Sequence, residues 1–355
     1  MDNGVKILRK HTKEVRVGNV FIGGKHRISV QSMTNTDTRD VQATIQQINR
    51  LEEAGCDIAR VAVPDAEAAD AIKNIKKSIH IPIVADIHFD YRIAIRSIEN
   101  GADKIRINPG NIGDTDNVKR VAQLAKSRGI PIRIGINSGS LDRSILEKYN
   151  GVTAEGMVES AQKHIKILEN LGFQDIVVSL KASSVPMMMS ACRLFADKFD
   201  YPQHLGVTEA GTIKAGTVKS AVGIGGLLAE GIGDTIRVSL TGDPIEEIAA
   251  GIYILKSLCL REQGINFISC PTCGRCMVDL IPIATEIENR VVKMDKNITV
   301  AVMGCAVNGP GEAREADIGI AGGKKEFILF KKGEIIRKIP QEKVIDELLH
   351  EIQTL

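Results

Sequence analysis

Four of the seven cysteines lie in two short segments of the carboxyl-terminal third of the chain. The first segment reads SCPTCGRC and holds Cys270, Cys273 and Cys276, and the second reads GCAVNGPGE and holds Cys305. A CxxC turn directs two thiolates at one centre, and a ligand from a distant loop completes many zinc and iron–sulfur sites. A disulfide pair or a set of buried thiols is the alternative, but proline and glycine in these crowded turns favour a metal. Counted by thiols alone, Cys276 is the fourth ligand.

Cationic side chains recur in apolar, strand-like runs earlier in the chain. Arg106, Arg133 and Arg237 lie in the runs IRIN, IRIGIN and IRVSLT, and the run VVSLK ends on Lys181. Because side chains alternate between the faces of a strand, one face of each run is aliphatic and the other carries the cation with small or polar groups. The aliphatic face is expected to meet helices, so the cations should point inward. Arg60, in the run IARV, follows this pattern less cleanly.

Buried cations need partners, because an unpaired charge inside a protein is very costly. Asp86 and Glu209 lie at strand ends and can serve as internal partners, but they leave an excess of about three positive charges if all groups are ionised. The cations concerned are Arg60, Arg106, Arg133, Lys181 and Arg237. A multiply charged anion such as a diphosphate is favoured over a purely structural salt-bridge network, and the arginine fork suits phosphate oxygens. Asp86 and His88 share a strand face. Three interpretations are open for them: an acid–base pair, half a metal site, or a hydrogen-bonded structural pair.

Eight apolar strand-like runs, each followed by a segment of helical period, organise the larger part of the chain. The runs are 28–33, 57–63, 81–88, 104–108, 130–137, 175–181, 204–209 and 235–241. Glycines at 55, 101, 129 and 172 end several helices ahead of the next strand. Eight β-then-α units in about 250 residues predict a (β/α)8 barrel of TIM type, with a doubly wound open sheet as the alternative. A small hairpin is expected within residues 9–27, ahead of the first run.

The pattern changes after the last barrel helix, near residues 263–266. We therefore predict an α/β protein of two domains, a (β/α)8 barrel over 1–262 and a smaller α+β domain over 263–355 that carries the metal site. Cys56, Cys192 and Cys259 fall in apolar patterns and are expected to be inert buried thiols. The VGIGG run at 222–226 lacks the context of a nucleotide loop, so close packing is expected there.

Composition excludes several classes of function. The net charge is only +2, aromatic residues make up 3% and tryptophan is absent, so a nucleic-acid-binding surface is not expected. No apolar run has the length of a membrane span or of a signal-peptide core, so a cytoplasmic protein without a membrane partner is expected. In a reducing compartment, seven cysteines favour thiols and metal ligands over disulfides.

Five motifs taken together closely resemble the 4-hydroxy-3-methylbut-2-enyl diphosphate synthase family of the methylerythritol phosphate route to isoprenoids. They are SCPTCGRC, GCAVNGPGE, VQSMT, KIRINPGN and HLGVTEAG. The resemblance runs from about residue 9 to the carboxyl terminus and fits the shorter, two-domain bacterial form. It implies an iron–sulfur oxidoreductase that reductively opens the ring of 2-C-methyl-D-erythritol 2,4-cyclodiphosphate and removes a hydroxyl as water. It also implies a [4Fe–4S] cluster with one iron open to the substrate.

The resemblance assigns roles to individual residues. Matched position by position, the cluster ligands are Cys270, Cys273, Cys305 and Glu312, which makes Cys276 a bystander. The substrate-binding residues are Arg60, Arg106, Asn108, Arg133, Asn137, Ser179, Lys181, Arg237 and Ser239. Asp86, His204, Glu209 and Glu312 are the catalytic residues, with Glu209 the first choice for proton delivery.

The resemblance also implies partners. The electron donor is a flavodoxin or a ferredoxin, since the sequence has no flavin or nicotinamide site of its own. The protein is expected to be a homodimer in which the cluster domain of one subunit covers the barrel of the other. Two rival functions remain: a zinc-stapled phosphate-binding module without a redox role, and a sugar-phosphate aldolase or isomerase with Lys181 as the Schiff-base former.

Overall fold

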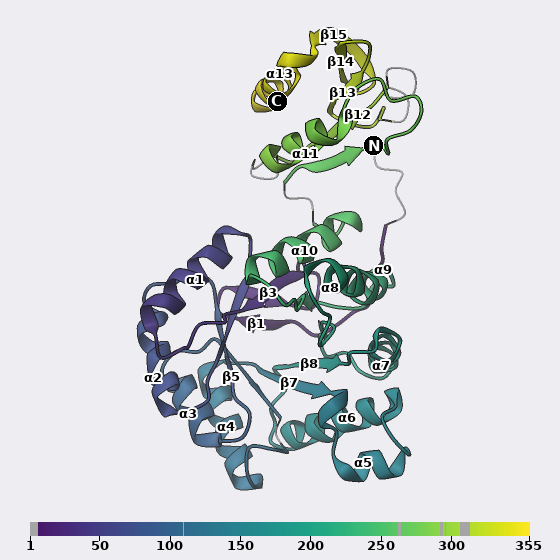
Figure 1. Ribbon diagram of the computed structural model, residues 1–355. Coiled ribbons are helices and arrows are strands. Elements are labelled where there is room, and N and C mark those ends of the chain that lie inside the picture. The colour runs from purple at the N-terminus through teal and green to yellow at the C-terminus, as the bar shows by residue number, and fades with distance from the viewer. Residues whose placement is uncertain (1–5, 109, 262–263, 292–293, 295, 306–312) are drawn as a thin grey trace. The chain divides into compact units, whose positions relative to one another are not determined.

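The computed structural model describes residues 6–108, 110–261, 264–291, 294, 296–305 and 313–355. The chain divides into two compact units, residues 1–261 and 262–355, each with its own sheet (Figure 1). None of the helices in the described ranges is long and apolar enough to cross a membrane. All seven cysteines are free.

The first unit is a barrel of eight strands in which all the pairings between named strands are parallel. The strands are β3 (Ser29–Met33), β4 (Ile58–Ala62), β5 (Ile83–Asp86), β6 (Lys104–Ile107), β7 (Ile132–Asn137), β8 (Ile176–Lys181), β9 (His204–Leu205) and β10 (Thr235–Ile236). They follow chain order from β3 to β8, and β10 joins β3 to β9. Val178 in β8 bridges Gln203 beside β9, and its N–H donates to the carbonyl of Pro202 at 2.9 Å. This contact closes the ring, so the predicted barrel is confirmed and the open sheet is excluded.

β9 and β10 are shorter than the predicted runs 204–209 and 235–241, because the backbone leaves the ladder early. Beyond β10, the Leu240 N–H donates to the carboxylate of Glu247 at 3.0 Å. Beyond β9, a Cβ on Gly206 would lie 2.7 Å from the carbonyl oxygen of Arg237, so the two chains approach too closely for a side chain. Further along, an isolated bridge between Thr212 and Thr241 extends the pairing.

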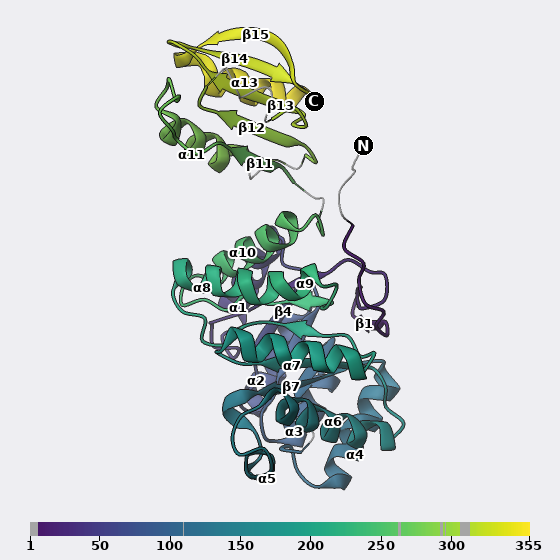
Figure 2. The ribbon, with the colours of Figure 1, turned by 90° about the vertical axis from the view of Figure 1, so that its right-hand side faces the viewer.

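Helices surround the barrel and cover the aliphatic outer faces of the strands (Figures 1 and 2). They are α1 (Val41–Glu53), α2 (Ala66–Ile75), α3 (Tyr91–Glu99), α4 (Thr115–Arg128), α5 (Arg143–Lys148), α6 (Ala154–Asn170), α7 (Val185–Lys198), α8 (Ile213–Ser220), α9 (Gly226–Ala229) and α10 (Pro244–Ser257). Side-chain oxygens of Asp40, Asp65 and Asp114 accept N–H groups in the first turns of α1, α2 and α4. Gly129 ends α4 in the left-handed conformation at φ +63°, as the glycine pattern predicts.

The amino-terminal hairpin closes the bottom of the barrel. It pairs β1 (Val15–Val17) with β2 (Val20–Ile22) in antiparallel fashion, as expected. Val17 and Ile22 pack with Ile58 of β4 and Val84 of β5 in one apolar cluster. These four residues, called here the apolar floor, are each fully buried and lie at the end of the barrel opposite the carboxyl ends of the strands.

The second unit is a five-stranded mixed sheet with helices on one face (Figure 2). Its elements are β11 (Asn266–Ser269), α11 (Leu280–Val291), β12 (Thr299–Met303), β13 (Ile318–Gly322), β14 (Glu326–Lys331), β15 (Glu334–Pro340) and α13 (Val344–Thr354). β11, β12 and β13 run parallel, and β14 and β15 continue the sheet in antiparallel fashion. Apolar residues of α11 and α13 form one core with β12, β13 and β14. The predicted α+β unit is confirmed.

Two local expectations have different outcomes. Cys56 and Cys192 are buried, as predicted, but Cys259 is exposed, so the expectation of a buried thiol there is wrong. Cys259 lies in the turn after α10, at φ +54°, and its N–H donates to the Lys256 carbonyl. The 222–226 run is close-packed, since a Cβ on Gly223 would lie 2.7 Å from the Cε atom of Met188.

Asp57 connects three parts of the barrel, and its removal should destabilise the fold. Its buried carboxylate accepts the Val30 N–H at 2.8 Å and an Arg27 guanidinium N–H at 2.5 Å, and it lies 3.5 Å from Arg261. We expect Asp57→Ala to lower the free energy of unfolding by about 2–4 kcal/mol, because it leaves the buried Val30 N–H without its acceptor and removes the carboxylate that faces Arg261.

Urea unfolding followed by tyrosine fluorescence measures this change, because all four tyrosines lie in the barrel unit and tryptophan is absent. Asp197→Ala, which removes an exposed ion pair with Lys10, is the control and should cost less than about 1 kcal/mol. Equal effects of the two substitutions would contradict the role of Asp57.

Candidate active site

A small cavity of about 180 Å³ opens among the carboxyl ends of the barrel strands. Its lining consists of Arg60, Asp86, His88, Arg106, Arg133, Gly135, Asn137, Ser179, Lys181, Thr208, Arg237 and Ser239. Nine of these residues are among the predicted site residues. The structure therefore brings the five predicted cations together, including Arg60, whose sequence pattern was ambiguous.

Asp86, at the end of β5, lies between two arginines. Its Oδ2 is 3.7 Å from Arg60 Nε, and its Oδ1 is 3.3 Å from Arg106 Nη1. Burial alone would raise the pKa of this carboxyl, but Arg60, Arg106 and Arg133 outweigh burial and hold the pKa below its ordinary value. Asp86 therefore stays ionised and neutralises part of the charge in the cavity.

Arg133 and Lys181 are the most deeply buried cations of the lining, 2% and 5% exposed. Arg133 Nη1 donates to the Ser179 hydroxyl at 2.9 Å, and no carboxylate pairs with either cation among the described residues. Burial and the neighbouring arginines lower the pKa of both groups well below their ordinary values. Both groups are thus poised to gain from an anion in the cavity.

Arg60 is held by a sulfur atom as well as by Asp86. Its Nε and Nη2 atoms lie 3.1 and 2.9 Å from the Met33 sulfur at the end of β3. Burial and the charge of Arg237 lower the pKa of Arg60 to about 10. The VQSMT motif therefore contributes directly to the placement of a cavity cation.

The second internal carboxylate belongs to Glu247, not to Glu209 as predicted. Glu247 Oε2 accepts the Ser32 hydroxyl at 2.7 Å and lies 3.5 Å from Arg237 Nε, and its Oε1 accepts the Leu240 N–H. Sequence reasoning missed Glu247 because it lies in the first turn of α10 rather than on a strand. The sequence feature that comes closest to revealing Glu247 is its position ten residues after Arg237, in the first turn of the helix that follows β10.

The lining is strongly cationic even after these pairings. Five cations face two carboxylates, Asp86 and Glu247, which leaves a net excess of three positive charges if all groups are ionised, and among the described residues Arg133 and Lys181 have no carboxylate partner. A compact anion with several charges is the complement of such a cavity, and arginine forks bind phosphate oxygens in pairs.

Two glycines make room for the cations. A Cβ on Gly135 would lie 2.8 Å from Arg106 Nε, and a Cβ on Gly206 would lie 2.9 Å from Lys181 Nζ. The Gly135 N–H donates to the Asn108 side-chain oxygen at 3.1 Å, which ties the ends of β6 and β7 together. Asn108 is thus adjacent to the cavity through Gly135, whereas Asn137 lines the cavity itself.

Glu209 and His204 do not line the cavity. Glu209 is exposed in the loop after β9 and adopts a left-handed backbone at φ +53°, which is uncommon for a residue other than glycine. His204 is 1% exposed at the amino end of β9, and neither ring nitrogen has a hydrogen-bond partner among the described residues. Burial, followed by the charge of Lys181, lowers the pKa of His204 well below its ordinary value, so the ring is neutral.

The cysteines of the second unit lie at the carboxyl edge of two parallel strands. Cys270 follows β11, and Cys305 follows β12 by two residues. The Cys270 sulfur accepts the Gly304 N–H at 3.1 Å, and the Cys270 N–H donates to the Val302 carbonyl at 3.3 Å. The register of β11 and β12 therefore brings the two cysteine segments side by side.

The CxxC turn itself is exposed. Hydrogen bonding by the Arg275 backbone N–H lowers the pKa of the exposed Cys273 thiol, while the half-buried Cys276 donates its thiol hydrogen to the Val278 carbonyl at 3.2 Å. Within the described ranges, no three His, Cys, Asp or Glu side chains converge as a metal cage. The remaining predicted ligand, Glu312, lies outside the described residues.

The donor set nevertheless fits a metal that prefers sulfur. Soft thiolates select iron–sulfur clusters or zinc, and an N–H donated to a cysteine sulfur stabilises the charged form that binds metal. Cys270 has such a contact, and Cys273 has a lowered pKa. The exposed turn also leaves its sulfur accessible from solvent.

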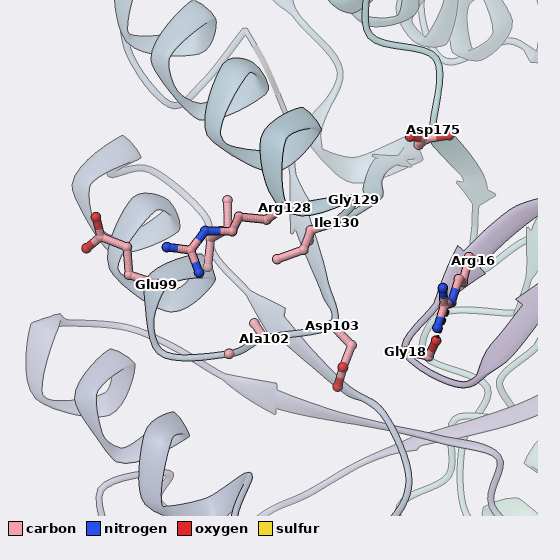
Figure 3. A pocket seen from close by; sticks show the side chains of 11 residues that line it. Arg16, Gly18, Glu99, Ala102, Asp103, Arg128, Gly129, Ile130 and Asp175 are labelled. Atoms are coloured by element: carbon pink, nitrogen blue, oxygen red, sulfur yellow. Dashed lines mark hydrogen bonds between the residues drawn. The ribbon is translucent and has the colours of Figure 1, made fainter.

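A larger cavity, of about 580 Å³, lies at the amino ends of the strands (Figure 3). Arg16, Asp103 and Arg128 line it from different segments, and their side chains do not converge on one point. Asp103 is already paired with Lys76 at 2.6 Å and accepts the Ile83 N–H at 2.8 Å. Active sites of this fold lie at the opposite, carboxyl end, so the smaller cavity is the candidate.

Comparison with known proteins identifies the family. The family model described as the GcpE TIM-barrel domain matches residues 12–252, and the GcpE protein C-terminal domain matches residues 266–354. The chain belongs to the GcpE family. A curated relative from Ruminiclostridium cellulolyticum is 66% identical over 98% of this chain and 99% of its own length. A second, from Caldanaerobacter subterraneus subsp. tengcongensis, is 62% identical over 98% of each chain.

Both GcpE relatives carry the name 4-hydroxy-3-methylbut-2-en-1-yl diphosphate synthase (flavodoxin), so the resemblance read from the five motifs is confirmed. Among solved structures, dihydropteroate synthase from Stenotrophomonas maltophilia matches with a TM-score of 0.51 at 14% identity. That match covers 69% of this chain and 96% of the other, and it shows a shared barrel fold alone.

If Gly135 makes room for Arg106, adding one methyl group there should weaken anion binding. We expect Gly135→Ala to raise the Kd for inorganic pyrophosphate at least about tenfold, because the Cβ displaces the Arg106 guanidinium. Isothermal titration calorimetry measures the Kd. Gly139→Ala, four residues further on, is the matched control, since its Cβ meets nothing within 4 Å. Equal affinities of the two variants would contradict the placement of Arg106.

Proposed function

We propose that this chain catalyses the reductive ring opening and dehydration of 2-C-methyl-D-erythritol 2,4-cyclodiphosphate to 4-hydroxy-3-methylbut-2-enyl diphosphate. The observation that carries the proposal is the cavity in which five cations face two carboxylates at the catalytic end of the barrel. The names of the close relatives support the same reaction. The reaction serves the synthesis of isoprenoid precursors without mevalonate.

In this proposal the barrel cations bind the diphosphate of the substrate. Arg133 and Lys181 are deeply buried without carboxylate partners, so they gain most from a bound anion. Arg60, Arg106 and Arg237 complete the cationic wall, each held by a carboxylate on one side. Ser179, Asn137 and Ser239 supply neutral polar contacts from the same lining, with Asn108 behind Gly135.

In this proposal Asp86, Glu209 and His204 contact the hydroxyls of the substrate and deliver the proton, with Glu209 the first choice, and Glu312 acts as an exchangeable ligand of the cluster. Asp86 stays ionised between its arginines and so is suited to orient a hydroxyl rather than to donate a proton. The left-handed backbone of Glu209 is strained, and strain of this kind clusters at functional sites, which supports a role beside the cavity residue Thr208. His204 lies deeper and neutral, where it can act only through groups between it and the substrate.

The proposed cofactor is a [4Fe–4S] cluster held by Cys270, Cys273, Cys305 and Glu312. When bound, the cluster supplies electrons one at a time and an iron with an exchangeable, non-thiolate position. The protein contributes the lowered pKa of Cys273 and the Gly304 N–H at the Cys270 sulfur. Ring opening breaks a carbon–oxygen bond, two electrons enter, and a hydroxyl leaves as water with the help of a proton from the chain.

The proposed electron donor is a flavodoxin, which the names of the relatives support, with a ferredoxin as the alternative. We further propose a homodimer in which the cluster unit of one subunit serves the barrel of the other. The free thiols support a cytoplasmic, reducing location.

The cofactor assignment is tested with anaerobically purified protein. We expect about four iron and four sulfide per chain, and turnover of the cyclic diphosphate with reduced flavodoxin. Cys305→Ser should lose most of the iron and the turnover, whereas Cys276→Ser, the matched control, should keep both. One zinc without sulfide would instead favour a phosphate-binding module without redox chemistry, and equal iron loss in the two variants would make Cys276 a ligand.

The dimer is tested by mixing two inactive variants, Arg133→Ala and Cys305→Ala. If each active site combines the barrel of one subunit with the cluster unit of the other, a mixed dimer has one intact site, and up to about a quarter of the parental turnover should return after random subunit exchange. Turnover before and after exchange is the measurement. No recovery in dimers shown to have exchanged subunits would count against a shared site.

A further inference from the structure

Lys104 is a buried cation that the proposed mechanism does not use. It is the first residue of β6 and shares the inner strand face with Arg106, two residues on. The side chain is 0% exposed, and its ammonium group has no hydrogen-bond partner among the described residues. Such a group is rare in proteins, because lysine is almost never fully buried unless it is paired.

The described residues around Lys104 supply no counterion. In the strand register it lies beside Val84, whose side chain belongs to the apolar floor that seals the barrel from below. Burial, and then the charges of Arg133 and Arg60, lower its pKa well below the ordinary value. The charged or titratable groups on the surrounding strands are Arg60, Asp86, Arg106, Arg133, Lys181, His204 and Arg237. Neither internal carboxylate pairs with Lys104, since Asp86 faces Arg60 and Arg106, and Glu247 faces Arg237.

A methionine would fill the same space without the desolvation of a charge, so packing alone does not explain a lysine at this position. The positive charge becomes favourable only when negative charge enters the cavity above. Arg133 connects the two levels, because it lines the cavity and lies beside Arg106 in the strand register, two residues above Lys104 on the same inner face. In a poorly solvated interior, a charge in this lower tier acts on an anion with little screening.

We propose that Lys104 is a positioning residue of the anion cavity, a cation of a deeper tier that acts through Arg133 and Arg60 on a bound diphosphate. This inference rests on the proposed function, since it requires that the cavity bind a diphosphate. The inference distinguishes the cations that line the cavity from Lys104, which lies beneath them.

The test compares Lys104→Met with the unaltered full-length protein. Calorimetric titration with inorganic pyrophosphate should give a Kd at least about tenfold higher for Lys104→Met, because a supporting charge is lost. Lys119→Met is the matched control: it removes the same charge from the exposed face of α4 and should change the Kd less than about twofold.

The stability of Lys104→Met toward urea distinguishes an electrostatic role of Lys104 from a packing role. In the absence of pyrophosphate, Lys104→Met should unfold at the same or a higher urea concentration than the unaltered protein, because it removes an unpaired buried cation. Weaker binding with unchanged or higher stability supports the inference. Unchanged binding overturns it, and weaker binding with a lower unfolding midpoint overturns it in favour of a packing role.

A second variant, Lys104→Arg, keeps the charge and decides the question if Lys104→Met does not fold. A Kd within about threefold of the parental value supports the inference, and a tenfold loss in a folded protein overturns it. If the unaltered protein does not bind pyrophosphate, this inference falls together with the proposed diphosphate cavity. If the unaltered protein and Lys104→Met bind equally well, only the role of Lys104 falls.

Discussion

Mutual repulsion among cations inside the barrel is the constraint on which much of the structure depends. Arg60, Arg106, Arg133, Lys181 and Arg237 share one cavity, and burial lowers the pKa of three of them. Such a cluster is destabilising by itself, so the surrounding structure must hold it in place. The closed ladder of parallel strands, the buried aliphatic outer faces and the apolar floor supply that stability. Asp86 and Glu247 relieve part of the repulsion, and a net excess of positive charge remains in the cavity.

The alternation of side chains along strands made part of this site predictable. Arg106, Arg133 and Arg237 each follow an isoleucine in a short apolar run, and a strand with one buried aliphatic face must turn such a residue inward. The alternation of side chains tells which face of a strand a residue lies on. It does not tell how far along the barrel axis the side chain lies, because that depends on the register between strands. His204 was therefore placed correctly on a strand but lies at its amino end, below the cavity rather than in it.

Glu247 is a cavity carboxylate that strand patterns in the sequence cannot predict. Its carboxylate reaches the barrel from the first turn of α10, so no strand pattern contains it. Glu209 was the candidate for the second internal carboxylate because it ends the apolar run 204–209. The strand stops at Leu205, however, and Glu209 is exposed in the loop that follows. The strands β9 and β10 end at Leu205 and Ile236. Beyond these ends the Leu240 N–H donates to the Glu247 carboxylate, and Gly206 approaches the Arg237 backbone.

The two units illustrate different kinds of sequence information. In the second unit the chemistry is local, since spacing within SCPTCGRC sets the turn and strand pairing brings in the segment of Cys305. In the barrel the cationic site is formed by several segments, because each cation comes from a different strand and the cavity is cationic only when they lie together. Local motifs therefore name the donor atoms, whereas the carboxylate that faces Arg237 is identified only after the ring is closed. A closed ring without an anion holds its cations at the expense of stability, so folding alone does not account for their number, whereas the proposed binding of a diphosphate does.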